Sequence, residues 1–151
     1  MAAIQLIQHA LKTSDIQFPT QFTRQRLPQF IVLGTQKGGT TSLHKLLMQH
    51  PGIFLPALKE LHYFTFHQNK SPNWYSNHYR TATAKQKRGE ITPYYLFHPE
   101  VPKRIHCLLP KVKLIVLLRD PVERALSQYF HAKRHGFENL SLQEALDSEA
   151  S

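Results

Sequence analysis

The pattern of apolar and polar positions separates a short N-terminal region from a longer domain. Near the start, Ile4, Ile7 and Leu11 recur at helical spacing, which predicts a short amphipathic helix. The stretch that follows is polar and basic, and a regular apolar pattern begins only after it. We therefore expect residues 1–28 to form an extension and residues 29–151 to form the main domain.

Three segments predict strands in the main domain, and the first and third of them are short apolar runs. The first covers residues 30–33 and ends at Gly34. The second covers residues 89–92 and enters a turn at Pro93. The third covers residues 113–119 and is the most strongly apolar of the three, so we expect it to be the central strand of the sheet.

Helical patterns lie between and after these runs. Helices are expected from Thr40 or Thr41 as N-cap to before Pro51, from Pro99 to Leu109, from Asp120 as N-cap to about Arg134, and from the capping box Ser141–Glu144 onward. Residues 62–79 are rich in aromatic residues and histidine and predict a loop with one or two short helices. The alternation predicts an α/β fold with a three-layer, P-loop-like parallel sheet flanked by helices. Three strands are too few for a complete sheet, so we expect the fold to be incomplete at the C-terminus.

Composition favours a basic globular domain with an anionic partner. Of the 151 residues, 41% are apolar, which allows a sizeable core, and the net charge is +9. That charge fits phosphates, sulfated glycans, nucleic acid or membrane surfaces, and it equally fits a basic fold without a charged ligand. The basic residues are scattered and form no arm, so we do not expect a nucleic-acid partner.

The sequence carries no pattern for a metal site, a disulfide or a membrane segment. The single cysteine, Cys107, excludes an intrachain disulfide and lies in a predicted helix, where we expect it to be buried. The ten histidines form neither an HExxH pattern nor a zinc-type cluster with cysteine, so no metal is expected. No apolar run approaches about 20 residues, and no signal-peptide pattern opens the chain. We therefore expect a cytoplasmic protein without a membrane partner.

A glycine-rich loop joins the first predicted strand to the helix that follows. The loop and helix start contain Lys37, Gly38, Gly39, Thr40, Thr41 and Ser42. Backbone N–H groups and a helix N-terminus form an anion site at such a place, and glycines allow a phosphate to approach closely. A Walker A loop would have its lysine at position 40, where threonine stands, so the usual grip on ATP is absent. A glycine turn without a ligand is the alternative.

A second anion site is predicted at the end of the third strand. Arg119 follows that strand at the edge where ligands of α/β sheets bind, and Ser127 lies about two turns into the next helix. The guanidinium group forms a bidentate fork for a phosphate, and the serine hydroxyl adds one hydrogen bond. Taken alone, Arg119 fits a structural ion pair equally well, and Arg124 fits a solvated surface charge. Asp120 before Pro121 fits an N-cap better than a magnesium ligand.

Together these segments resemble the sulfotransferases that use 3'-phosphoadenosine-5'-phosphosulfate (PAPS). Residues 34–43 resemble the family's 5'-phosphosulfate loop, and residues 118–129 resemble its 3'-phosphate motif. Residues 59–64, Lys-Glu-Leu-His-Tyr-Phe, and residues 90–95, Glu-Ile-Thr-Pro-Tyr-Tyr, are similar to segments of the heparan-sulfate-type branch. The resemblance covers roughly residues 30–146, and the motifs follow the family's order.

The resemblance implies roles for individual residues. Lys37 and the loop after it hold the 5'-phosphosulfate, Arg119 and Ser127 hold the 3'-phosphate, and Glu60 is the catalytic base with His62 beside it. The charge of Lys37 also stabilises the leaving oxygen, so Lys37, Glu60 and His62 form the expected catalytic set. The co-substrate is PAPS without a metal, and the acceptor is a hydroxyl or amine of a small molecule or a glycan.

Several alternatives stay open at this level. Without the resemblance, Glu60 fits a solvated loop carboxylate and His62 fits a histidine packed among aromatic residues. A P-loop kinase or NTPase would bind ATP with magnesium, and a non-catalytic module would bind anions through charge alone. The chain also fits an inactive fragment, because the family's C-terminal strand and basic loop have no counterpart in it. Some heparan-sulfate enzymes carry lysine where this chain has Ile91, which leaves room for a different acceptor.

Overall fold

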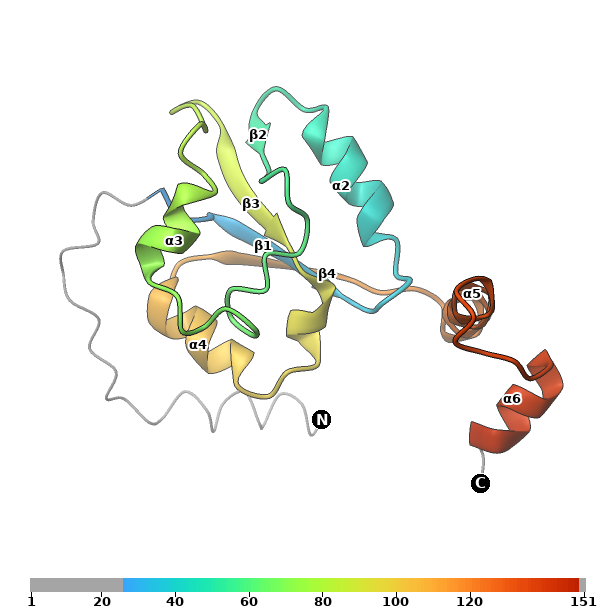
Figure 1. Ribbon diagram of the computed structural model, residues 1–151. Helices are drawn as coiled ribbons and strands as arrows, with labels where there is room; N and C mark the ends of the chain where they lie inside the picture. The colour runs from blue at the N-terminus through green and yellow to red at the C-terminus, as the bar shows by residue number, and fades with distance from the viewer. Residues whose placement is uncertain (1–25, 150–151) are drawn as a thin grey trace.

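The computed structural model describes residues 26–149, which form a parallel sheet, helices that cover it, and two further helices beside it (Figure 1). The strands are β1 (Phe30–Gly34), β2 (Ile53–Phe54), β3 (Lys87–Ile91) and β4 (Lys113–Leu117). The helices are α2 (Thr40–Met48), α3 (Pro72–Asn77), the 3-10 helix η2 (Pro93–Leu96), α4 (Val101–Leu108), α5 (Pro121–Arg134) and α6 (Leu142–Glu149). The helix predicted near the start of the chain lies outside the described residues, and the domain boundary at residue 28 stays a prediction.

The four strands confirm the predicted parallel α/β fold. They stand in the order β2-β3-β1-β4, and every pairing is parallel. The prediction that residues 113–119 form the central strand is wrong, because β4 lies at an edge of the described sheet and β1 lies between β3 and β4. An apolar run reports that a strand favours burial, but it carries no information on strand order. Although Leu114, Ile115 and Val116 of β4 are apolar, their side chains are exposed within the described part of the chain.

The side chains of β1 alternate between two cores, and this alternation produces the three layers. Ile31 and Leu33 join the larger core, which includes residues of α3 and α4. Val32 points to the opposite face and joins a smaller core, where Leu43 and Leu47 of α2 pack against it. Figure 1 shows α2 on one side of the sheet and α3 and α4 on the other.

A polar cluster lies inside the larger core. Glu90 of β3 is buried, and its carboxylate accepts hydrogen bonds from the hydroxyl groups of Tyr75, Thr92 (2.8 Å) and Tyr95 (2.7 Å). Burial raises the pKa of Glu90, and the three hydrogen bonds lower it by less. The hydroxyl of Tyr95 also accepts a hydrogen bond from the backbone N–H of Phe64 (3.2 Å). The cluster therefore ties the segment around Phe64 to the sheet.

The ends of α5 and α6 follow the predicted capping patterns. Asp120 accepts a hydrogen bond from the backbone N–H of Glu123 (3.0 Å) at the start of α5. At the start of α6, Ser141 and Glu144 form the reciprocal hydrogen bonds of a capping box, of 2.8 and 3.3 Å. Figure 1 shows both helices beyond the carboxyl end of β4, away from the faces of the sheet. The sequence therefore defines these helices locally, without contacts to the cores.

Candidate functional site

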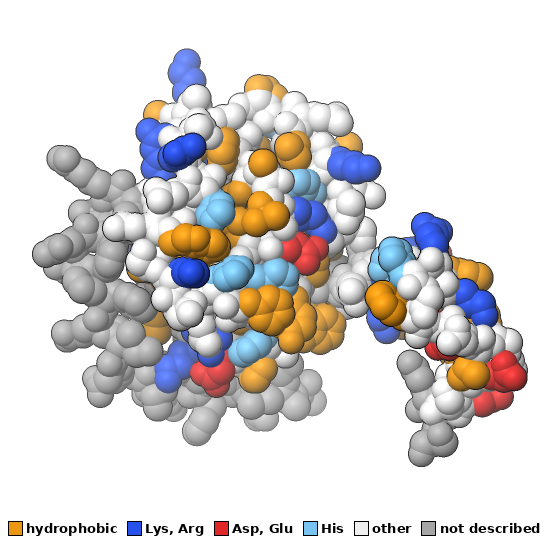
Figure 2. Space-filling model, in the orientation of Figure 1, with side chains coloured by type: hydrophobic (Ala, Val, Ile, Leu, Met, Phe, Trp, Pro, Cys, Tyr) orange, Lys and Arg blue, Asp and Glu red, His pale blue; other side chains and the backbone are white. Residues whose placement is uncertain are grey.

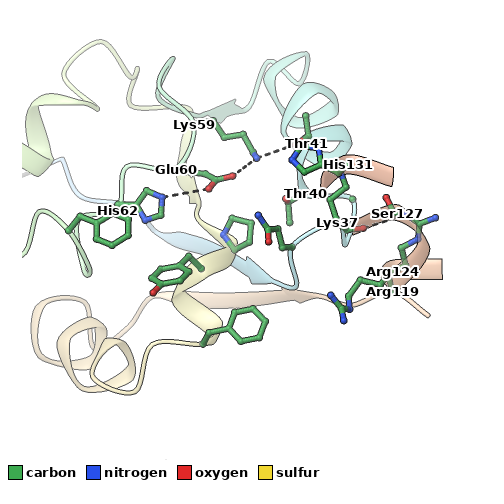
Figure 3. A pocket seen from close by; sticks show the side chains of 16 residues that line it. Lys37, Thr40, Thr41, Lys59, Glu60, His62, Arg119, Arg124, Ser127 and His131 are labelled. Atoms are coloured by element: carbon green, nitrogen blue, oxygen red, sulfur yellow. Dashed lines mark hydrogen bonds and ion pairs between the residues drawn. The ribbon is translucent and has the colours of Figure 1, made fainter. Parts of the chain in front are cut away.

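A cavity of about 820 Å³ lies where β1, β3 and β4 end. Its walls come from the loop after β1 with the start of α2, from residues 59–66, from the turn after β3, and from α5 (Figure 3). Ligands of parallel sheets bind at this edge. The cavity is lined by eight of the ten residues predicted for the site, namely Lys37, Gly39, Thr40, Thr41, Glu60, His62, Arg119 and Ser127.

The loop after β1 places Lys37 and the start of α2 at the cavity. Gly39 is the N-cap of α2 with a φ of 96°, a conformation that a Cβ atom disfavours. The prediction that Thr40 or Thr41 caps this helix is wrong, because the cap position falls on Gly39 and no side chain accepts a hydrogen bond there. The N–H groups of the first turn therefore point to the cavity without a side-chain cap and are available to an anion.

Gly38 and Ser42 are the two predicted residues that do not line the cavity. The N–H of Gly38 donates to the carbonyl oxygen of Thr35 (2.9 Å). A Cβ at position 38 would lie 2.8 Å from both this oxygen and the Thr35 hydroxyl, and 3.2 Å from the carbonyl oxygen of Leu117. Gly38 therefore shapes the loop by packing closely beneath it. Ser42 is exposed on α2.

Arg119 connects the end of β4 to the glycine loop. Its Nη1 donates to the carbonyl oxygen of Lys37 (3.4 Å), and its Nε donates to the carboxylate of Glu123 (3.1 Å). Arg119 thus forms an ion pair with Glu123 and also lines the cavity, and its role as a phosphate ligand stays a prediction. Ser127 lines the same wall. The two predicted anion-binding groups therefore share one space.

Lys59, Glu60 and His62 lie on the other side of the loop (Figure 3). The Nζ of Lys59 lies 2.6 Å from Oε1 of Glu60 and donates to the hydroxyl of Thr41 (3.2 Å). Nε2 of His62 lies 3.6 Å from Oε2 of Glu60, and Nδ1 lies 3.1 Å from the hydroxyl of Thr65. Desolvation lowers the pKa of His62, and the charge of Glu60 raises it by less. The imidazole is therefore neutral at pH 7.

The three residues of the expected catalytic set share an unusual backbone conformation. Lys37, Glu60 and His62 have φ values of 65°, 62° and 52°. Within residues 26–149 they are the only non-glycine residues with positive φ. Such conformations cost energy and occur most often at functional sites. The backbone thus singles out the same three residues that the motifs indicate.

Several lining residues carry no role in the sequence prediction. On α5, Arg124 and His131 line the cavity on either side of the predicted residue Ser127. Their spacing of three and four residues places them on one helix face, which is a signal that the sequence contains. Partial desolvation and then the charge of Lys37 lower the pKa of His131, in agreement with α5 facing the loop. Lys59 could have been found from its place beside Glu60.

The fold and the cavity define a parallel α/β domain whose cavity brings together several groups that can bind anions. The N-terminus of α2, Lys37, Arg119 and Arg124 all line this cavity, and Nη1 of Arg119 lies 3.4 Å from the carbonyl oxygen of Lys37. The particular family follows from comparison with known proteins. Residues 27–149 match the family described as the sulfotransferase domain, and the chain belongs to this family.

Named relatives and a solved structure agree with this membership. The chain is 44% identical over 106 residues to the membrane-associated sulfotransferase kil1 of Dictyostelium discoideum, covering 68% of the chain and 22% of the relative. It is 36% identical over 107 residues to the human heparan sulfate glucosamine 3-O-sulfotransferase 5, covering 70% of the chain and 31% of the relative. A crystal structure of a sulfotransferase from Alicyclobacillus acidocaldarius superposes with a TM-score of 0.72 at 32% identity, over 82% of the chain and 57% of that protein.

Two expectations are settled by these comparisons. The kinase or NTPase alternative is not favoured, since the matching family and relatives are sulfotransferases. The expected cytoplasmic location is wrong, because one relative is named as membrane-associated and others are named for heparan sulfate. Among the described residues, none of the helices is long and apolar enough to cross a membrane. The chain spans less than a third of the length of these curated relatives.

Proposed function

We propose that the chain forms the nucleotide-binding half of an enzyme that transfers a sulfuryl group from PAPS to a hydroxyl or amine of a small-molecule or glycan acceptor. The observation that carries this proposal is the shared cavity. The glycine loop and Arg119 line one space, and Arg119 donates a hydrogen bond to Lys37. PAPS has anionic groups at its 5' and 3' positions, so its recognition requires two anion-binding groups in one cavity. Membership in the sulfotransferase family supports the same assignment.

In this proposal the glycine loop binds the 5'-phosphosulfate. The N–H groups at the start of α2, the hydroxyl groups of Thr40 and Thr41, and the ammonium group of Lys37 supply the donors. Ser42 contributes through its backbone N–H, because its side chain does not line the cavity. Lys37 stabilises the negative charge that grows on the leaving oxygen during transfer.

The 3'-phosphate binds between the end of β4 and α5. Arg119 supplies a guanidinium fork and Ser127 a hydroxyl donor. Arg124 lies one helical turn before Ser127 and lines the same wall, so it adds a second positive charge. Because Arg119 already pairs with Glu123, its side chain is held near the loop before the ligand arrives.

Glu60 removes the proton from the acceptor. As this proton passes to the carboxylate, the acceptor oxygen or nitrogen forms a bond to sulfur, and the bond between sulfur and the 5'-phosphate oxygen breaks. The products are the sulfated acceptor and adenosine 3',5'-bisphosphate. The neutral imidazole of His62, which lies 3.6 Å from Glu60, orients the carboxylate. Lys59 holds Glu60 beside Thr41 through its two contacts.

Titration calorimetry of this chain tests the nucleotide assignment. We expect tighter binding of adenosine 3',5'-bisphosphate than of AMP, which lacks the 3'-phosphate. Arg119→Ala is expected to weaken binding of the bisphosphate about 10- to 100-fold, as expected for a lost charge-assisted hydrogen bond, and to leave AMP binding unchanged. Arg134→Ala, which removes an arginine of α5 outside the cavity, is the matched control. Equal affinity for the two nucleotides would contradict the proposal.

A further inference from the structure

The cavity has a second wall that the nucleotide-binding residues leave unused. Phe66, Tyr94 and Phe97 line it and are 65%, 44% and 62% exposed; we call these three residues the aromatic wall. The ring of Phe66 lies 4.7 Å from that of His62 and 5.6 Å from that of Tyr94, measured between centroids. Figure 2 shows hydrophobic and histidine side chains gathered on the face of the domain turned to the viewer. Large apolar side chains exposed within a cavity indicate a ligand surface.

The local structure fixes the direction of these side chains. Tyr94 lies on η2 and Phe97 is the C-cap residue of this helix, three residues later, and side chains at this spacing eclipse one another in a 3-10 helix. Tyr95 lies between them, points into the core, and donates a hydrogen bond to Glu90. Phe64 is likewise buried, whereas Phe66 is exposed. The exposure of the wall is therefore built into well-packed segments.

Two residues of the aromatic wall adjoin His62, whose ring centroid lies 4.7 Å from that of Phe66 and 6.0 Å from that of Tyr94. Figure 3 shows Lys37, Arg119 and Arg124 on the far side of Glu60 from His62. Lys59 is the remaining lysine among the lining residues, and it is paired with Glu60. Ile91, where some heparan-sulfate enzymes carry lysine, is buried in the smaller core. The aromatic wall therefore offers apolar contacts to an acceptor, and the neighbouring Lys59 is already paired with Glu60.

We propose that the aromatic wall binds an uncharged acceptor by the apolar face of a ring and presents its hydroxyl group to Glu60. This inference rests on the proposed function and narrows its acceptor class. A sulfated sugar would bring several negative charges against Phe66 and Tyr94, which adjoin the imidazole of His62, and among the described residues the nearby Lys59 is already paired with Glu60, so the loss of hydration would be costly. A phenol and a neutral sugar ring share the required chemistry, since each carries a hydroxyl group on a ring with an apolar face.

A titration followed by NMR distinguishes these acceptors. This chain, saturated with adenosine 3',5'-bisphosphate, is titrated separately with 4-methylphenol, methyl β-glucoside and a trisulfated heparin disaccharide. We expect at least one uncharged probe to bind more tightly than the disaccharide, and the tighter of the two identifies the source of the ring. Phe66→Ala and Phe97→Ala are each expected to weaken its binding about tenfold. The control Phe137→Ala, at a residue that is 83% exposed and outside the cavity, should leave it unchanged.

The outcomes separate this inference from the proposed function. Because the substituted side chains are exposed, both variants are expected to fold, which circular dichroism checks, and to keep the affinity of the unaltered chain for the bisphosphate. If the bisphosphate does not bind the unaltered chain, the proposed function itself is wrong. If it binds but the disaccharide binds more tightly, if neither uncharged probe binds, or if the phenylalanine variants bind the probe normally, the inference about the acceptor alone is overturned.

Discussion

Removal of the buried carboxylate of Glu90 should destabilise the fold far more than removal of its charge. The carboxylate accepts hydrogen bonds from Tyr75, Thr92 and Tyr95 inside the larger core. Glu90→Ala leaves three buried hydroxyl groups without their acceptor, so we expect a loss of about 3–5 kcal/mol in the free energy of unfolding. Glu90→Gln keeps one oxygen for Tyr95 and Thr92 and places an amide beside Tyr75, with an expected loss of about 1 kcal/mol.

The pH dependence gives this prediction a sign. Because burial raises the pKa of Glu90 above its ordinary value of 4.5, the folded protein holds the carboxyl proton more tightly than the unfolded chain. The stabilising contribution of this group is therefore fully present below pH 4.5 and is lost as the pH rises through the raised pKa. Glutamine does not titrate. The stability of the unaltered chain relative to Glu90→Gln should thus increase as the pH falls from 7 towards 5.

Urea unfolding, followed by far-UV circular dichroism at pH 7 and pH 5, measures both effects. With a typical slope of about 1–3 kcal/mol per molar urea, Glu90→Ala should lower the midpoint by about 2 M. Tyr75→Phe removes a single donor and should cost about 1–2 kcal/mol, so it provides a measurable value if the alanine variant does not fold. Either of two results would refute the role assigned to this cluster. One is an equal loss of unfolding free energy in Glu90→Ala and Glu90→Gln. The other is a difference in stability between the unaltered chain and Glu90→Gln that shrinks as the pH falls.

Three further predictions concern the loop, the base and a helix cap. Gly38→Ala should lower the affinity for adenosine 3',5'-bisphosphate in calorimetry, because its Cβ would lie 2.8 Å from two oxygen atoms of Thr35; unchanged affinity would mean that the loop shape does not matter. In the full-length enzyme, Glu60→Gln should slow the formation of adenosine 3',5'-bisphosphate from PAPS about 10²–10⁴-fold without weakening the binding of this nucleotide. A normal rate of formation would exclude Glu60 as the base. Asp120→Ala should lower the free energy of unfolding by about 1 kcal/mol through loss of the N-cap of α5, measured by urea unfolding, and an unchanged midpoint would show that the cap is not needed.

Most local elements could be predicted from the sequence because their causes are local. The apolar run ending at Gly34 gives β1, Asp120 before Pro121 gives the start of α5, and the Ser141–Glu144 pattern gives a capping box that the structure contains. The two-residue strand β2 is too short to leave a pattern. The place of β4 depends on which strands pair with it, and no local feature encodes that pairing.

The candidate site likewise has a part that the sequence predicts and a part that only the fold reveals. The motifs indicate Lys37, Glu60 and Arg119 as functional residues, but only the folded chain shows that they line one cavity. The aromatic wall illustrates the limit more clearly. Tyr94 and Tyr95 are adjacent and chemically identical, yet one lines the cavity and the other is 1% exposed in the core. Their directions are set by the 3-10 helix after β3, whose geometry the sequence pattern does not specify.

The polar core and the strained site residues belong to one energetic arrangement. A non-glycine residue in the left-handed conformation costs about 1–3 kcal/mol, so Glu60 and His62 keep their backbone only if the surrounding structure holds it. The N–H of Glu60 donates to the carbonyl oxygen of Ile91 (3.2 Å), and the carbonyl oxygen of His62 accepts from Thr65 and His67 at 3.1 Å each. Next along the segment, the N–H of Phe64 donates to Tyr95, which is anchored on Glu90. Loss of the Glu90 cluster should therefore release the strained segment as well as loosen the core, which couples the stability of the fold to the geometry of the site.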